Sequence, residues 1–191
     1  MKKVDLGDLR GDIVIFGGVY SNLHALEALI NHTINCGISP DNVICTGDVV
    51  AYCAYAEESV KLIREFGCHV LAGNCEQQLA NKSNDCGCGF EEGSVCSILS
   101  KTWYAHAKSQ VSELSLDWMS NLPERIVFNH DGLRYGVVHG GASDISKFVW
   151  PVDSDGILED EFNLLQTQIG KLDCLVAGHT GIPMIRDFNK K

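Results

Sequence analysis

The chain has 191 residues, 45% of them hydrophobic and 21% charged, a composition typical of a globular protein with a sizeable core. Its formal net charge of −10 disfavours binding to a nucleic-acid backbone or an anionic membrane, because both repel an acidic surface. No apolar run approaches the roughly 20 residues that a membrane span needs, and no secretory signal is recognisable. We therefore expect a cytoplasmic protein whose nine cysteines are mostly reduced.

The first part of the chain alternates between short apolar strands and amphipathic helices. Strands are predicted at 13–16, 42–45 and 69–71, and helices at 22–34 and 57–66. This alternation predicts parallel strands with helices packed outside them.

The middle of the chain has a different pattern. A polar, glycine-rich loop is predicted at 81–93, followed by helices at 94–108 and 112–121. We interpret residues 94–122 as a helical insert within one domain that spans 1–191. Four aromatic residues could line a substrate pocket, but we expect them to form the small core of this insert: Trp103, Tyr104, Trp118 and Trp150.

The last part returns to strands. They are predicted at 126–128, 133–138 and 175–177, with a hairpin turn between the first two. A helix is predicted at 159–169, and the acidic residues of 153–161 are expected to be a solvated helix start.

Four predicted strands end beside a glycine and a polar residue that can bind a metal. These residues are Asp48, Asn74, His139 and His179. Ligand sites in open α/β sheets lie beyond the carboxyl ends of the strands, so the four side chains should converge. Each residue alone is more often a turn or hydrogen-bonded structural residue, but four at four strand ends indicate a site. One carboxylate, one amide and two imidazoles suit a divalent ion such as Mn, Fe, Zn or Ni.

The segments around these residues resemble the motifs of calcineurin-like metallophosphoesterases. They are Gly47-Asp48-Val49-Val50-Ala51-Tyr52, Gly73-Asn74-Cys75-Glu76, Val138-His139-Gly140 and Gly178-His179-Thr180-Gly181. The likeness runs from about residue 13 to 183 and is nearest to the small bacterial and archaeal phosphodiesterase-like branch. It implies an α/β fold, a four-layer α/β/β/α sandwich with two mixed sheets, and a two-metal site that hydrolyses phosphate esters.

The family fold also implies further strands beyond the last predicted one. We find no such segment before the chain ends at 189–191, so C-terminal strands of the second sheet are expected to be missing. The sheet edge left exposed would invite pairing with another chain, and a homo-oligomer formed through this edge is predicted.

The chain departs from the family pattern at four positions: Gly18, Tyr20, Cys75 and Gly181. The family has an aspartate at the first position and a histidine at each of the other three. The resemblance implies one metal held by a complete set: Asp48, Asn74, His139 and His179. The second metal would keep only the bridging Asp48, with Tyr20 as an additional candidate ligand, so one ion is expected.

The candidate catalytic residues implied by the resemblance are Asp48, Asn74, Cys75 and His139. We predict a metal-dependent phosphoesterase that hydrolyses a small phosphomonoester or phosphodiester. The alternative is a catalytically impaired pseudoenzyme that binds a phosphorylated ligand or nucleotide, since a thiol at position 75 is a poorer proton donor than histidine. The two cysteines of the loop, Cys86 and Cys88, are either packing thiols or, with Cys75, ligands of a soft metal.

Overall fold

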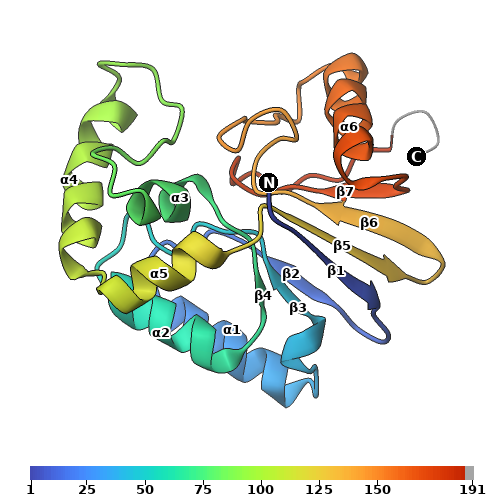
Figure 1. The fold of residues 1–191 in the computed structure, drawn as a ribbon, viewed down its shortest axis with the longest axis horizontal. Coiled ribbons are helices and arrows are strands. Elements are labelled where there is room, and N and C mark those ends of the chain that lie inside the picture. The colour runs from blue at the N-terminus through green and yellow to red at the C-terminus, as the bar shows by residue number, and fades with distance from the viewer. Residues whose placement is uncertain (188–191) are drawn as a thin grey trace.

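Two β-sheets lie against each other, with helices on their outer faces (Figure 1). The computed structural model describes residues 1–187, so the chain end at 189–191 named above lies outside the described residues. No helix in this part of the chain is long and apolar enough to cross a bilayer.

The first sheet contains the strands of the predicted strand–helix alternation. Its order is β2 (Val14–Phe16), β3 (Val43–Cys45) and β4 (His69–Val70), and both pairings are parallel. Helices α1 (Leu23–Asn35) and α2 (Ala56–Phe66) make the two crossovers. The prediction of parallel strands with outer helices is therefore confirmed. Parallel neighbouring strands need a crossover connection, and a helix is the usual one.

The second sheet is mixed. Its order is β1 (Lys3–Asp8), β5 (Arg125–His130), β6 (Leu133–Val137) and β7 (Cys174–Val176). The antiparallel β5–β6 hairpin is confirmed, whereas the other two pairings are parallel. Two mixed sheets were expected, but only this one is mixed in the described residues.

Strand β1 was not predicted. Its apolar residues Val4 and Leu6 alternate with charged ones, which is the pattern of a strand with one buried face. Its partner β5 lies about 120 residues further along the chain, and a single short segment gives no information about such a distant partner.

The remaining helices are α3 (Asn74–Ala80), α4 (Val95–Gln110), α5 (Glu113–Asn121) and α6 (Asp155–Ile169), with a 3₁₀ turn at Pro40–Asn42. Helix α3 was not predicted, and α6 begins four residues earlier than expected. The helices α4 and α5 lie where the insert was predicted.

Three apolar clusters hold these elements together. One lies between the outer helices and the parallel sheet, and a second lies between α6 and the mixed sheet. The third combines residues of both sheets: Ile44, Leu71, Ile126, Phe128 and Val137. This is the packing that an α/β/β/α sandwich requires, because each sheet buries one face against helices and one against the other sheet.

The expectation of a solvated acidic helix start is wrong for Glu161. This side chain is 5% exposed, and its carboxylate accepts hydrogen bonds from the backbone N–H groups of Ala142 and Ser143 at 2.6 and 3.0 Å. It also pairs with Lys147 at 2.6 Å. Glu161 therefore fixes the loop that follows His139 to helix α6.

We predict that Gly136→Val lowers the free energy of unfolding by about 1–3 kcal/mol through overpacking. A Cβ at this position would lie 2.7 Å from Leu172 and 3.0 Å from Ile169, where α6 closes on β6. The matched control is Gly156→Ala, at an open position of α6, which should leave stability unchanged or raise it by up to about 1 kcal/mol. Urea unfolding measures both; an equally stable Gly136→Val protein would contradict this packing.

Candidate metal centre

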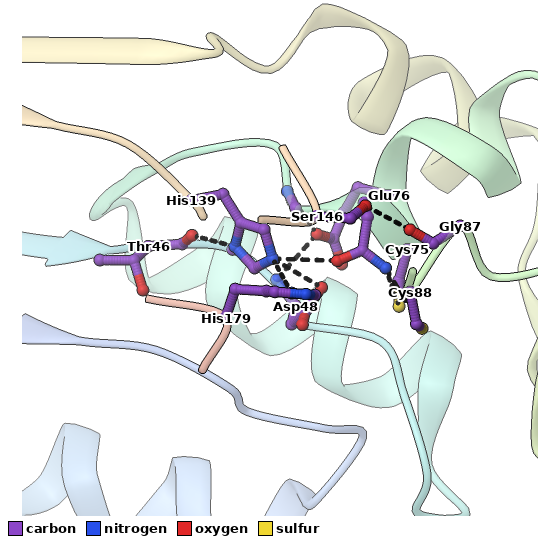
Figure 2. A network of polar contacts seen from close by, with 12 residues as sticks. Thr46, Asp48, Cys75, Glu76, Gly87, Cys88, His139, Ser146 and His179 are labelled. Atoms are coloured by element: carbon purple, nitrogen blue, oxygen red, sulfur yellow. Dashed lines mark hydrogen bonds and ion pairs between the residues drawn. The ribbon is translucent and has the colours of Figure 1, made fainter. Parts of the chain in front are cut away.

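The four predicted ligands converge at the carboxyl ends of strands from both sheets. Figure 2 shows three of them, Asp48, His139 and His179, pointing toward one another. Asp48 follows β3, Asn74 follows β4, His139 follows β6 and His179 follows β7. Candidate ligand atoms of Asp48, His139 and His179 all lie within 4.8 Å of one another. The two sheets therefore meet at a single polar centre.

His139 Nε2 lies at the middle of this centre. It is 3.0 Å from Asn74 Oδ1, 3.2 Å from His179 Nδ1 and 3.4 Å from Asp48 Oδ1. The side chains of His139 and Asp48 are only 2% and 7% exposed, so bulk water has little access to these contacts. Four potential ligand atoms thus point toward one small volume.

The hydrogen bonds around the centre orient these atoms as metal ligands. His139 Nδ1 lies 2.7 Å from the carbonyl oxygen of Thr46, which favours a proton on Nδ1 and a lone pair on Nε2. The amide nitrogen of Asn74 donates to the carbonyl of Cys86 at 2.8 Å, so its oxygen points into the centre. These contacts set the orientation of both side chains before any ligand binds.

A cation accounts for these contacts better than a single proton does. A proton on His139 Nε2 can serve only one of the three neighbouring acceptors. Asp48 Oδ1 is buried without a hydrogen bond in the described residues, although buried polar atoms normally have a partner. The donor set therefore fits a divalent ion bound by carboxylate, amide and imidazole groups.

The charges of the centre are strongly coupled. Burial raises the pKa of Asp48, but the nearby His139 outweighs burial, so this pKa lies below its usual value. Burial lowers the pKa of His139, but Asp48 outweighs it and raises this pKa. Burial and His139 together lower the pKa of His179, which favours a neutral imidazole. Within the described part of the chain, the Nε2 atom of His179 makes no hydrogen bond of normal geometry, although the Ser146 carbonyl lies close enough to oppose part of this lowering.

Several residues at the centre have left-handed backbone conformations that side chains rarely adopt. Asp48, His179 and Tyr20 have φ values of 55°, 58° and 55°. Such conformations cost about 1–3 kcal/mol each and persist where the surrounding structure holds them. Their concentration here indicates a functional site.

Glu76 was not assigned a role from the sequence, yet it connects the loops of Asp48 and Asn74. It is fully buried, and its carboxylate accepts hydrogen bonds from the backbone N–H groups of Asp48, Val50 and Gly73 at 2.9, 3.0 and 2.8 Å. Burial and then Asp48 raise its pKa to about 7. The sequence did hold a signal for this role. Glu76 stands three residues after Gly73, which is the position of the glutamate in a helix-capping box.

Cys75 lies under the centre rather than at its surface. The thiol is 1% exposed, and burial, followed by Asp48, raises its pKa well above the usual value, so it stays protonated. Cys86 and Cys88 are joined by a disulfide, and the amide nitrogen of Asn74 lies 3.3 Å from Cys88 Sγ. The soft-metal alternative requires free thiolates and is not supported by this pairing.

Tyr20 fills the space beside Gly18. A Cβ on Gly18 would lie 2.3–2.6 Å from the Tyr20 ring and hydroxyl, and Gly18 itself has a φ of 66°. The Tyr20 ring also contacts Tyr52 with a centroid distance of 4.9 Å. The position of the family's first aspartate is therefore occupied by a packed aromatic ring. The role of Tyr20 as a metal ligand stays a prediction.

The family model for calcineurin-like phosphoesterases matches residues 6–190. The chain belongs to this family. The match includes all four converging residues, and the resemblance drawn from the motifs is thereby confirmed.

Individual relatives support the same fold. The uncharacterized protein MJ0912 of Methanocaldococcus jannaschii is 28% identical over 178 residues, covering 93% of this chain and 65% of the relative. A metallophosphoesterase structure from Sphaerobacter thermophilus matches with a TM-score of 0.61 and 22% identity, covering 88% of this chain and 60% of that one. The hypothetical protein PH1004 of Pyrococcus horikoshii matches with a TM-score of 0.70 and 15% identity, covering 90% of this chain and 70% of that one. This chain thus spans about two thirds of the length of these proteins.

One groove lies beside the centre without including the converging ligands. This groove of about 1030 Å³ runs along β7, between α6 and residues 182–187, and its lining includes the neighbours of two converging residues, Gly140 beside His139 and Gly178 beside His179. Strand β7 is the last strand of its sheet in the described residues. The homo-oligomer expected through this edge stays a prediction.

We predict that Glu76→Gln lowers both stability and metal affinity, because one amide group cannot accept all three backbone hydrogen bonds. The free energy of unfolding should fall by about 1–3 kcal/mol, and Mn²⁺ affinity by roughly 10–100-fold. Thermal unfolding with and without Mn²⁺, together with calorimetric titration, measures both effects.

The matched control is Glu92→Gln in the exposed part of the loop before α4. It should behave as the unmodified protein in both measurements. A Glu76→Gln protein that binds Mn²⁺ with unchanged affinity would show that the three hydrogen bonds do not position the ligands.

Proposed function

We propose that this protein is a phosphoesterase that works with one divalent ion held by Asp48, Asn74, His139 and His179. The observation that supports this proposal is the convergence of three acceptors on His139 Nε2 within 3.0–3.4 Å, where Asp48 Oδ1 finds no hydrogen-bond partner among residues 1–187. A divalent ion bound by this set supplies a Lewis acid for a phosphoryl oxygen and lowers the pKa of water.

The residues of the chain supply position and protonation state. The Thr46 carbonyl favours the neutral His139 tautomer that carries its proton on Nδ1 and turns the lone pair of Nε2 toward the centre. The Cys86 carbonyl holds the amide nitrogen of Asn74. The lowered pKa of His179 favours its neutral form. Asn74 and His179 thus present lone pairs without rearranging, which limits the reorganisation that binding requires. The raised pKa of His139 means that its protonated form must lose the Nε2 proton before it binds an ion.

A single ion is favoured over a pair by the packing around Tyr20. The first-motif aspartate of the family is absent, and the space that its side chain would need is filled by the Tyr20 ring. The burial and raised pKa of Cys75 weigh against a role as proton donor to a leaving group. Its predicted catalytic role stays a prediction, and modest turnover is expected.

The test is metal content together with hydrolysis. Elemental analysis should find about one ion per chain after reconstitution with Mn²⁺, and generic phosphomonoesters and phosphodiesters should be hydrolysed only with metal. Asp48→Ala should reduce both metal binding and turnover by more than about 100-fold, because it removes a ligand rather than an outer contact. The exposed Asp117→Ala in α5 is the control and should change neither.

The second candidate is a pseudoenzyme that binds a phosphorylated ligand. The observation that favours it is the occupation of the second-metal region by Tyr20. One bound ion and a bound phosphate ester without metal-dependent turnover would identify this function. A protein that binds no divalent ion would contradict both candidates.

We predict that Gly18→Asp alone destabilises the protein, since its Cβ would overlap the Tyr20 ring. Gly18→Asp combined with Tyr20→His and Gly181→His should relieve this overlap and bind a second ion, because position 181 faces open space. The left-handed φ values of Gly18 and Gly181, 66° and 70°, mean that this protein should still be less stable than the unmodified one. Metal stoichiometry distinguishes the two proteins. Adding Cys75→His should then raise turnover. If this variant is stable and binds two ions but turns over substrate no faster than the unmodified protein, the loss of ligands is not the reason for low activity.

A further inference from the structure

An aromatic wall begins at the metal centre and leads away from it. We define the aromatic wall as Phe90, Phe148 and Trp150. The Phe148 ring lies 4.5 Å from the His179 ring between centroids, and Trp150 stacks on Phe148 at 5.2 Å with an interplanar angle of 10°. Phe90 stacks on Phe148 at 6.3 Å. The expectation that Trp150 belongs to the core of the helical insert is therefore wrong.

We propose that the aromatic wall binds the base of a nucleoside phosphate whose phosphate lies at the metal centre. This inference rests on the proposed function and names its substrate class. Trp150 is 39% exposed, so part of its ring remains open beside a flat, stacked neighbour. Bases stack on aromatic side chains whatever their sequence identity, because every base has a π-face.

The wall is held in place by its neighbours, as a binding surface must be. The N–H of Val149 donates to Thr180 Oγ1 at 2.9 Å, which joins the wall to the loop of His179. Ser146 donates to the carbonyl of Gly87, which joins it to the loop that carries Phe90 (Figure 2).

Trp150 itself begins a tight turn. Its N–H donates to Asp153 Oδ2 at 2.8 Å, and its carbonyl accepts from the N–H of Asp153 at 3.0 Å. Arg186 donates to the carbonyl of Pro151 at 3.0 Å and holds the same turn from outside. The side chain is thus presented by an ordered segment and loses little freedom on binding.

Among the described residues, the aromatic wall has no unpaired cation beside it in the sequence that would attract a charged group of the ligand. Lys147, the cation next to Phe148 in the sequence, is already paired with Glu161 at 2.6 Å. The chain as a whole carries a net charge of −10. Contact with an uncharged aromatic group fits these surroundings better than contact with further anionic groups.

The test compares two ligands that differ only in the base. Calorimetric titration of the Mn²⁺-loaded protein with adenosine 5′-monophosphate and with ribose 5-phosphate measures the contribution of the base. We expect the nucleotide to bind roughly 5–100-fold more tightly, the range that stacking on one aromatic side chain gives. Trp150→Ala should remove most of this difference without changing the affinity for ribose 5-phosphate or Mn²⁺, and Trp150→Phe should restore part of it.

The matched control is Val152→Ala in the same turn, where the side chain is 91% exposed. It should leave the preference for the nucleotide intact. Equal affinities of the unmodified protein for the two ligands, or an equal loss for both in Trp150→Ala, would overturn the role of the wall while leaving the metal centre standing. Failure of both ligands to bind the Mn²⁺-loaded protein would instead overturn the proposed function and this inference together.

Discussion

The buried carboxylate of Glu76 joins the loops that follow two parallel strands, and the geometry of the metal centre depends on it. Its oxygens accept backbone hydrogen bonds from Asp48, Val50 and Gly73. A carboxylate in this position is costly unless its lone pairs are satisfied, and three N–H donors satisfy them. The same bonds hold Asp48 in a left-handed conformation, so that its side chain faces His139.

The two halves of the family's bimetal site differ in how they are built in this chain. The half that keeps its ligands also keeps the contacts that orient them, including the Thr46 carbonyl behind His139. The other half is packed rather than merely depleted, because the Tyr20 ring lies against Gly18 and Tyr52. The space beside Gly18 is therefore filled, as protein interiors generally are, rather than left as a cavity.

The loops after β6 and β7 connect the metal centre to its surroundings. Glu161 holds the loop that follows His139, and Thr180 holds Val149 beside the aromatic wall. Glu161 belongs to α6, which packs on the mixed sheet, and Thr180 follows β7 of that sheet. His139 and His179 also follow strands of the mixed sheet, whereas Asp48 and Asn74 follow strands of the parallel sheet. The centre therefore lies where the two sheets meet, because each sheet contributes two of the four converging side chains.

The sequence by itself determined the strand–helix alternation and the hairpin, and it singled out the four residues that converge in the candidate metal centre. Hydrophobic periodicity and glycines at strand ends are local signals, and each of the four converging residues stands at a strand end next to a glycine. Helix α3 was missed because its seven residues are too few to show a period, and β1 because its partner is distant.

Only the tertiary structure decided what surrounds these ligands. It placed Glu76 beneath two loops, Glu161 in the core and Trp150 on Phe148 rather than in the helical insert. It also placed the Tyr20 ring in the space beside Gly18. Burial, ring stacking and the satisfaction of a buried carboxylate depend on segments far apart in the chain, and no pattern within a short window specifies which segments will meet.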